Sequence, residues 1–378
     1  MSGIYIHVPF CYQRCHYCDF YSTLRLEDRN SFVKALIREI ISRKDFLKGE
    51  IIDTLYFGGG TPSVLDSKSI DLIIKKIRSN YSLNEDVEIT LEANPDDLNK
   101  KYLNELINNG VNRLSIGIQS FIDKDLEKLN RRHNTKQAMD AVLFAHEIGF
   151  KKISIDLIYG LPGQKIEDWE KNLEKAVSLP VEHISAYHLT YEKGTRFYKW
   201  LKECKMSEAD ENLSLDFFHA TIKILEREGF DHYEISNFAR NNQYSRHNIK
   251  YWLGEQYLGI GPSAHSYNGI VRQWNIADFD RWMKNDQENS EVLKSEKIDR
   301  EIRRNEMIMT RLRTKWGIPQ AEFIELFGYE AWEKLLELIT PFLIGNFVEY
   351  KNNKIVLTQK GKFLADGIIA DLFILAKA

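Results

Sequence analysis

The stretch "PFCYQRCHYCDFYS", residues 9–22, holds three of the four cysteines in this chain of 378 residues. Cys11, Cys15 and Cys18 follow the spacing C-x3-C-x2-C, directly after an apolar segment of strand character. Cysteines this close together are badly spaced for a disulfide framework, and in a reducing compartment such thiols serve as metal ligands or redox groups. The stretch therefore predicts a metal centre at the end of the first strand, in a protein of the cytoplasm.

Short strand-like segments alternate with amphipathic helices through the first two thirds of the chain. Helical spacing of apolar residues is visible, for example, over residues 31–47. Such alternation implies parallel strands joined by right-handed crossovers, and hence a doubly wound sheet or a full or partial barrel. The strands are predicted at residues 4–8, 54–59, 87–93, 113–120, 152–160 and 183–191.

Ligands of both architectures bind at the carboxyl ends of the strands. After the cysteines, the next strand ends are "GGGTP", "LEANP", "GIQSF" and "IDLIYGLPG". Glycines without a Cβ atom let the backbone approach a ligand closely, and carboxylate and guanidinium groups bind polar ligands. The sequence therefore predicts a binding site at this edge of the sheet.

The sequence pattern changes after about residue 270. A charge-rich stretch predicts a linker over residues 271–300, between a first domain of residues 1–270 and a smaller domain of residues 301–378. The second domain is expected to be winged-helix-like. Its predicted elements are helices over 300–312 and 319–341, a hairpin that turns at Asn352 and Asn353, and a last helix from about residue 360.

Composition narrows the classes of partner. Hydrophobic residues make up 43% and charged residues 28% of the chain, which is typical of a globular protein. The formal charge of -3 is spread over interleaved residues, so no basic face predicts binding of nucleic acid. No apolar run reaches the roughly 18 residues that a membrane span needs, so no span is expected.

Two kinds of metal centre fit three clustered thiols. Structural zinc takes four nitrogen or sulfur ligands, and His16 or the distant Cys204 could complete such a set. A 4Fe-4S cluster is normally held by four thiolates, and three would leave one iron open to an external ligand. Both alternatives stand at this point.

The cysteine spacing, followed by an aromatic residue at Phe20, resembles the motif of radical S-adenosylmethionine enzymes. In that family three thiolates hold a 4Fe-4S cluster, and the open iron binds the amino and carboxylate groups of S-adenosylmethionine, which one electron cleaves to a 5'-deoxyadenosyl radical. The resemblance implies a partial (β/α)6 barrel. Tyr17 and Phe20 are expected to pack around the cluster.

A longer series of motifs resembles the oxygen-independent coproporphyrinogen III oxidase-like family. "IYIHVPFC", "YFGGGTPS", "EANPDDL", "RLSIGIQSF", "LNRRHN", "DLIYGLPGQ", "HNIKYW" and "YLGIGPSAHSY" occur in the order typical of that family. The resemblance implies binding of S-adenosylmethionine by eight residues: Tyr5, Gly59, Gly60, Thr61, Glu92, Gln119, Arg131 and Asp156.

Two departures from the oxidase pattern resemble the heme-chaperone (HemW-type) branch of the family. The oxidase has a further cysteine where this chain has Phe20, and a longer segment before its first strand. Membership of this branch implies that the protein binds heme and passes it to an acceptor protein, with an electron donor for the cluster. His247 in "HNIKYW" is a candidate heme ligand, with His265 second and Cys204 third, and a structural role for His247 is equally compatible with the sequence.

Two other functions remain open from the sequence. One is the oxidase reaction itself, the radical decarboxylation of coproporphyrinogen III. The other is a zinc-stabilised binding module, which would need no radical chemistry.

Overall fold

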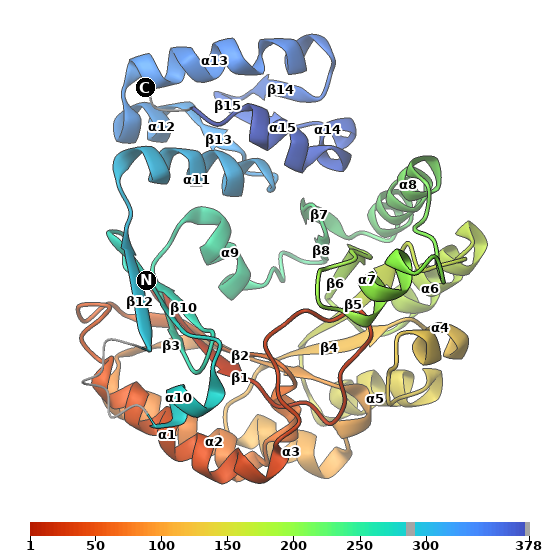
Figure 1. Cartoon of the computed structure of the whole chain (residues 1–378), viewed down its shortest axis with the longest axis vertical. Helices are drawn as coiled ribbons and strands as arrows, with labels where there is room; N and C mark the ends of the chain where they lie inside the picture. The colour runs from red at the N-terminus through yellow and green to blue at the C-terminus, as the bar shows by residue number, and fades with distance from the viewer. Residues whose placement is uncertain (285–291, 375–378) are drawn as a thin grey trace.

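The computed structural model describes residues 1–284 and 292–374 of the chain. In this part of the chain twelve strands form one open sheet in the order β12-β11-β10-β9-β1-β2-β3-β4-β5-β6-β8-β7 (Figure 1). The six strands predicted from the sequence lie side by side and parallel at its centre. They are β1 (Ser2–Val8), β2 (Ile52–Gly59), β3 (Leu83–Ala93), β4 (Arg113–Gln119), β5 (Lys152–Tyr159) and β6 (His183–His188).

The six parallel strands and their crossover helices form the expected partial barrel. β9 (Tyr257–Ile260) adds a further parallel strand beside β1, while β8 (Asn237–Ala239) and β7 (Asp231–Glu234) continue the other side in antiparallel fashion. β12 and β7 end the order without pairing with each other, so the barrel is open along one side.

Amphipathic helices cover the outer face of the sheet (Figure 1). Their apolar stripes pack on strand residues such as Ile4, Leu55 and Ile116, which are fully buried. The helix predicted over 31–47 ends at Ser42, before a turn that contains Lys48 and Gly49 at positive φ. The covering helices are α1 (Arg29–Ser42), α2 (Ser67–Asn80), α3 (Lys100–Asn108), α5 (Thr135–Ile148) and α6 (Ile166–Ser178).

Helix α9 (Arg246–Leu253) closes the amino end of the barrel. Its His247 lies against the start of β1, where a Cβ atom on Gly3 would approach the imidazole to 3.0 Å and Thr54 Oγ1 to 2.7 Å. Glycine at this position therefore lets α9 pack directly under the first two strands.

The predicted linker over 271–300 is wrong. Within it, β11 (Val271–Asn275) and β12 (Leu293–Lys297) extend the sheet together with β10 (His265–Tyr267). Helix α10 (Phe279–Lys284) follows β11, and residues 285–291 lie outside the described residues. Of the charged residues after position 291, Lys294, Glu296 and Lys297 belong to the edge strand β12, where charge faces solvent and discourages strand pairing.

The carboxyl-terminal lobe has a core of its own, built around Trp332, Phe323 and Ile355. Its hairpin turns at Asn352 and Asn353 with φ of 52° and 59°, which confirms the predicted turn. Two predicted helices are each divided in two, at Gly328 and at Leu364. The elements are α11 (Arg300–Leu312), β13 (Ile318–Pro319), α12 (Gln320–Phe327), α13 (Tyr329–Ile344), β14 (Val348–Lys351), β15 (Lys354–Leu357), α14 (Gln359–Phe363) and α15 (Ala365–Asp371).

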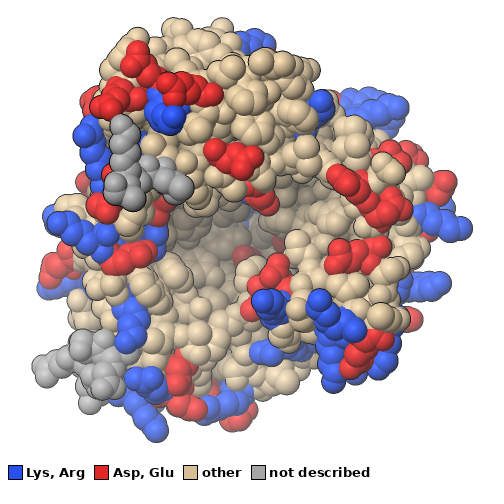
Figure 2. Space-filling view, turned by 45° about the horizontal axis from the view of Figure 1, so that its top comes forward, with Lys and Arg blue, Asp and Glu red and all other residues tan. Residues whose placement is uncertain are grey.

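The two lobes contact each other through α9 and α11 and through ion pairs. Lys315 pairs with Asp231, and Arg313 lies 3.6 Å from the buried carboxylate of Glu234. Figure 2 shows a hollow at the centre of one face, with acidic and basic side chains interspersed around it. Among the described residues, no helix has both the length and the apolar character needed to cross a bilayer.

Glu39 of α1 ties the sheet extension to the barrel, and its removal tests this arrangement. Its buried carboxylate accepts hydrogen bonds from Gly261 N, Asn275 Nδ2 and Trp282 Nε1 at 2.7–2.9 Å. We expect Glu39→Ala to lower the free energy of unfolding by about 3 kcal/mol, because three buried donors lose their acceptor. Urea unfolding measures the loss. Lys34→Ala on the exposed face of the same helix is the control, and equal stability of the two variants would contradict the role.

Candidate functional site

The three clustered cysteines lie on one loop at the carboxyl end of β1. All three are half-buried free thiols. Cys11 Sγ is 3.4 Å from Thr61 Oγ1, and Cys15 Sγ accepts from Arg131 Nη1 at 3.3 Å. Burial raises the pKa of the Cys18 thiol to about 11 and raises that of Cys11 too. Without a bound cation the Cys11 and Cys18 thiols stay protonated at neutral pH, so positive charge is needed to hold them as thiolates.

The glycine loop after β2 is fastened to the cysteine loop through its backbone. Gly60 N donates to Val8 O and Thr61 N to Phe10 O, both at 2.8 Å. Gly59 has a φ of 109°, and a Cβ atom there would lie 2.6 Å from the His7 ring. Only glycine adopts this φ without strain and leaves room for the His7 ring. Gly59 therefore allows the two loops to lie close together.

Glu92, at the end of β3, is a buried carboxylate beside this loop. It accepts from Tyr56 OH at 2.8 Å and from Gly59 N at 3.2 Å. Burial raises the pKa of Glu92 to about 7, against the opposing hydrogen bond from Tyr56. The negative charge of Glu92 in turn adds to the burial that raises the pKa of Tyr5. A cationic amine placed here would gain a charge-assisted partner that water does not screen.

Arg131 links the cysteine loop to the ends of β3 and β4. Its Nη2 donates to Asn94 Oδ1 and to Gly117 O, both at 2.6 Å, while Nη1 faces Cys15. Gln119 adopts a φ of 69°, in the left-handed region that costs a non-glycine residue energy. Such backbone strain is found mainly where a side chain must be aimed at a functional site.

Asp156 lies on β5, deeper in the barrel. Ser115 Oγ is 3.4 Å from its carboxylate, and burial raises its pKa to about 6. Together with the glycine loop, Glu92 and Arg131, it places polar side chains on four neighbouring parallel strands and the loops that follow them. The predicted cosubstrate residues are thus brought to one side of the sheet.

His247 is not part of this group. It is 1% exposed on α9, with Nδ1 hydrogen-bonded to Thr54 Oγ1 at 2.8 Å and Nε2 to Tyr251 OH at 2.9 Å. Burial lowers its pKa to about 3, so the imidazole is neutral. Both ring nitrogens are occupied, and in this conformation His247 cannot bind heme iron. The structural alternative left open by the sequence fits this geometry.

The position of Phe20 also differs from the prediction that it packs around the cluster. Its side chain is 67% exposed, whereas Tyr17 packs against buried residues of a small cluster around Phe197. Packing around the cysteine loop therefore involves Tyr17 and not Phe20.

Three residues at the site escaped the sequence analysis. His7 connects Tyr5 OH and Tyr21 O at 3.1 and 3.0 Å, Tyr56 holds Glu92, and Asn94 holds Arg131. All three lie inside quoted motifs, "IYIHVPFC", "YFGGGTPS" and "EANPDDL", so their position next to named residues was the available signal.

The donor set can be tested against each kind of metal centre. Over residues 1–284 and 292–374, no three Cys, His, Asp or Glu side chains converge so as to hold one metal ion. In a 4Fe-4S cluster each thiolate binds a different iron, so the sulfurs need not converge on one point. Three half-buried thiols on one loop, with Cys204 exposed elsewhere, fit a cluster with one iron left open.

Comparison with known proteins agrees with this fit. Residues 5–176 match the family model of the radical SAM superfamily, and residues 298–364 match that of the HemN C-terminal domain. The heme chaperone HemW of Bacillus subtilis is 32% identical over 97% of this chain and 98% of its own. HemW of Lactococcus lactis is 33% identical over 97% and 98%, and a mitochondrial radical S-adenosyl methionine domain-containing protein 1 of Danio rerio is 33% identical over 99% and 87%.

The fold has a counterpart among solved structures. Coproporphyrinogen III oxidase (HemN) of Escherichia coli, a radical SAM enzyme, superposes with a TM-score of 0.85 over 98% of this chain and 90% of its own, at 24% identity. At that identity the likeness concerns the fold.

An open parallel barrel with three thiols beside a glycine loop defines the class of radical S-adenosylmethionine proteins, whose cofactors are a 4Fe-4S cluster and S-adenosylmethionine. Within that class, the chain belongs to the HemW-type branch of the coproporphyrinogen III oxidase-like family.

The pKa of Glu92 gives a testable pH dependence. The pKa of Glu92 is about 7 in the folded protein and about 4.5 in the unfolded chain, so the folded protein binds more protons between these two pH values. The stability of the ligand-free protein therefore falls as the pH rises from about 4.5 to about 7. We expect Glu92→Gln to raise the stability of the ligand-free protein at pH 8 by about 2 kcal/mol and to leave it nearly unchanged at pH 4.5. Thermal unfolding at both pH values measures this. An equal gain at both would contradict the buried carboxylate.

Proposed function

We propose that the protein is a heme chaperone, which binds heme and transfers it to an acceptor protein, and which carries a 4Fe-4S cluster and S-adenosylmethionine. The observation that carries the proposal is full-length similarity to proteins named heme chaperone HemW, in a chain with Phe20 where the oxidase has a further cysteine. Closely spaced free thiols favour a reducing compartment, so the proposal retains the cytoplasm.

In this proposal Cys11, Cys15 and Cys18 each bind one iron of the cluster, and the open iron is available to S-adenosylmethionine. When bound and reduced, the cluster supplies the electron that cleaves this cosubstrate. An electron donor is therefore part of the proposal. Arg131 Nη1 now donates to Cys15 Sγ, and it would be positioned to hold both the cluster ligand and the methionyl carboxylate.

The remaining residues surround the cosubstrate. Glu92 and the glycine loop would bind the cationic methionyl amine, because a buried carboxylate and the loop backbone lie together there. The other polar side chains would bind the ribose and adenine. We assign eight residues to the cosubstrate: Tyr5, Gly59, Gly60, Thr61, Glu92, Gln119, Arg131 and Asp156.

Metal analysis separates the cluster from the zinc alternative. Anaerobically reconstituted protein should contain about four irons and four sulfides per chain. Cys15→Ala should lose most of both, because one iron loses its ligand. Cys204→Ala, which changes an exposed cysteine outside the loop, should retain them. Stoichiometric zinc without sulfide would contradict the proposal.

Heme handling separates the chaperone from the oxidase. We expect the reconstituted protein to bind heme, seen as a Soret band, to pass it to apomyoglobin, and to release no carbon dioxide from coproporphyrinogen III in the presence of S-adenosylmethionine and a reductant. Free heme and apomyoglobin without the protein are the control. Decarboxylation without heme binding would overturn the proposal in favour of the oxidase.

A further inference from the structure

If the proposed function holds, a side chain other than His247 binds the heme iron. The histidines differ in whether their ring nitrogens are hydrogen-bonded to the protein. The chain has ten. Among the described residues, seven have a ring nitrogen bonded to a protein group: His7, His16, His133, His183, His188, His232 and His247. The other three, which have no such bond, are His146, His219 and His265.

The three unbonded histidines differ in their surroundings. His146 and His219 are exposed on the outer helices α5 and α8 (Glu211–Arg227), which cover the sheet. His265 is exposed at the start of β10, where its ring stacks on Trp274 at 5.8 Å between centroids and 14° between planes. Of these three histidines, only His265 lies on a strand with its ring stacked on an aromatic side chain.

The face of the sheet that carries His265 is well defined by pairing. His265 pairs with Trp274 and Tyr267 with Arg272, so these four side chains share one face. The residues between them, Ser266 and Gln273, point the other way and bond Arg43 of α1. The first face is therefore turned away from the helical layer.

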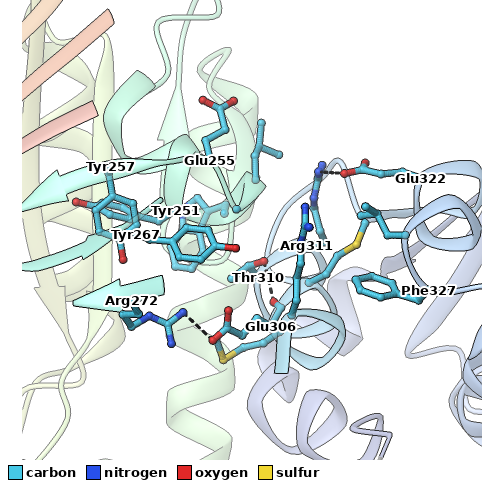
Figure 3. Close-up of a pocket in the computed structure, with 17 residues that line it drawn as sticks. Tyr251, Glu255, Tyr257, Tyr267, Arg272, Glu306, Thr310, Arg311, Glu322 and Phe327 are labelled. Atoms are coloured by element: carbon cyan, nitrogen blue, oxygen red, sulfur yellow. Dashed lines mark hydrogen bonds and ion pairs between the residues drawn. The ribbon is translucent and has the colours of Figure 1, made fainter. Parts of the chain in front are cut away.

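The same face continues into a cleft between the lobes. Tyr267 and Arg272 form one wall, and Glu306, Thr310 and Phe327 lie on the other (Figure 3). The cleft has a volume of about 350 Å³, and its lining combines aromatic side chains with three arginines and three glutamates. Such a lining suits a flat ligand that carries charged groups.

One cation in the cleft is unpaired. Arg272 is bound to Glu296 and Glu306, and Arg311 to Glu322, at 2.7–3.0 Å. Arg303 also lines the cleft, and within the described residues its guanidinium has no ion pair or hydrogen bond. It is thus available to a carboxylate of a ligand.

We propose that heme binds on the face formed by β10 and β11, with His265 as the iron ligand and a heme carboxylate at Arg303. This inference rests on the proposed function and names its binding site. Trp274 holds the plane of the imidazole, and the macrocycle extends from His265 toward Tyr267 and the cleft.

The chemistry of His265 and its exposure agree with this role. Partial burial and the neighbouring charge of Arg272 lower the pKa of His265, which favours the neutral ring with a lone pair available to iron. The side chain still reaches solvent, so an acceptor protein could approach a heme bound there. A chaperone needs this opening, because its heme must leave.

Heme titration of variants tests the proposal. His265→Ala should weaken heme affinity at least tenfold and shift the Soret band of what still binds, and added imidazole should restore the wild-type spectrum. His219→Ala is the control and should match the wild type. Wild-type affinity and spectrum in His265→Ala would overturn the inference and leave the chaperone proposal standing. A wild type that binds no heme would overturn both.

The carboxylate contact is tested separately. Arg303→Glu should weaken binding of hemin at least threefold, with little effect on hemin dimethyl ester, which has no free carboxylates. Arg227→Glu, at an exposed site on α8, controls for net charge. An equal loss with both ligands, or no loss with either, would overturn the assignment of Arg303.

Discussion

The backbone hydrogen bonds between the first two strand ends are the constraint on which the site depends. Gly60 N and Thr61 N donate to Val8 O and Phe10 O, so the glycine loop and the cysteine loop are joined through their backbones. Thr23 N returns to Pro9 O at 2.7 Å and closes the cysteine loop. The proposed metal ligands and cosubstrate residues are thereby held by adjacent parallel strands, whose register is fixed by the buried core.

Parallel pairing explains why so much of this site could be predicted from the sequence. Alternating strands and helices place each strand end at the same edge, so "GGGTP", "LEANP" and the cysteine loop had to meet there. The six central strands were predicted within a few residues, because their apolar runs and bounding glycines are strong local signals. The position of Glu92 at a strand end follows from the same topology, whereas the role of Arg131 is implied by the family resemblance.

Other features depend on contacts that no local pattern contains. The charged segment after residue 270 has the composition of a linker, and only pairing with β10 makes it a strand. His247 stands in a family motif, yet whether its nitrogens are free depends on Thr54, nearly two hundred residues earlier in the chain. The same holds for His265, whose ring makes no hydrogen bond within the described part of the chain because of its place at the start of β10.

Helix α9 limits the directions from which a ligand can reach the barrel. His247 packs against Gly3 and Thr54 at the amino end, which leaves the carboxyl end and the open side for access. The proposed cosubstrate residues lie on the central strands, whereas β10 lies toward one edge of the sheet. Tyr267 and the cleft lie at the amino end of β9, so a ligand that extends from His265 toward the cleft leaves the carboxyl end of the barrel open.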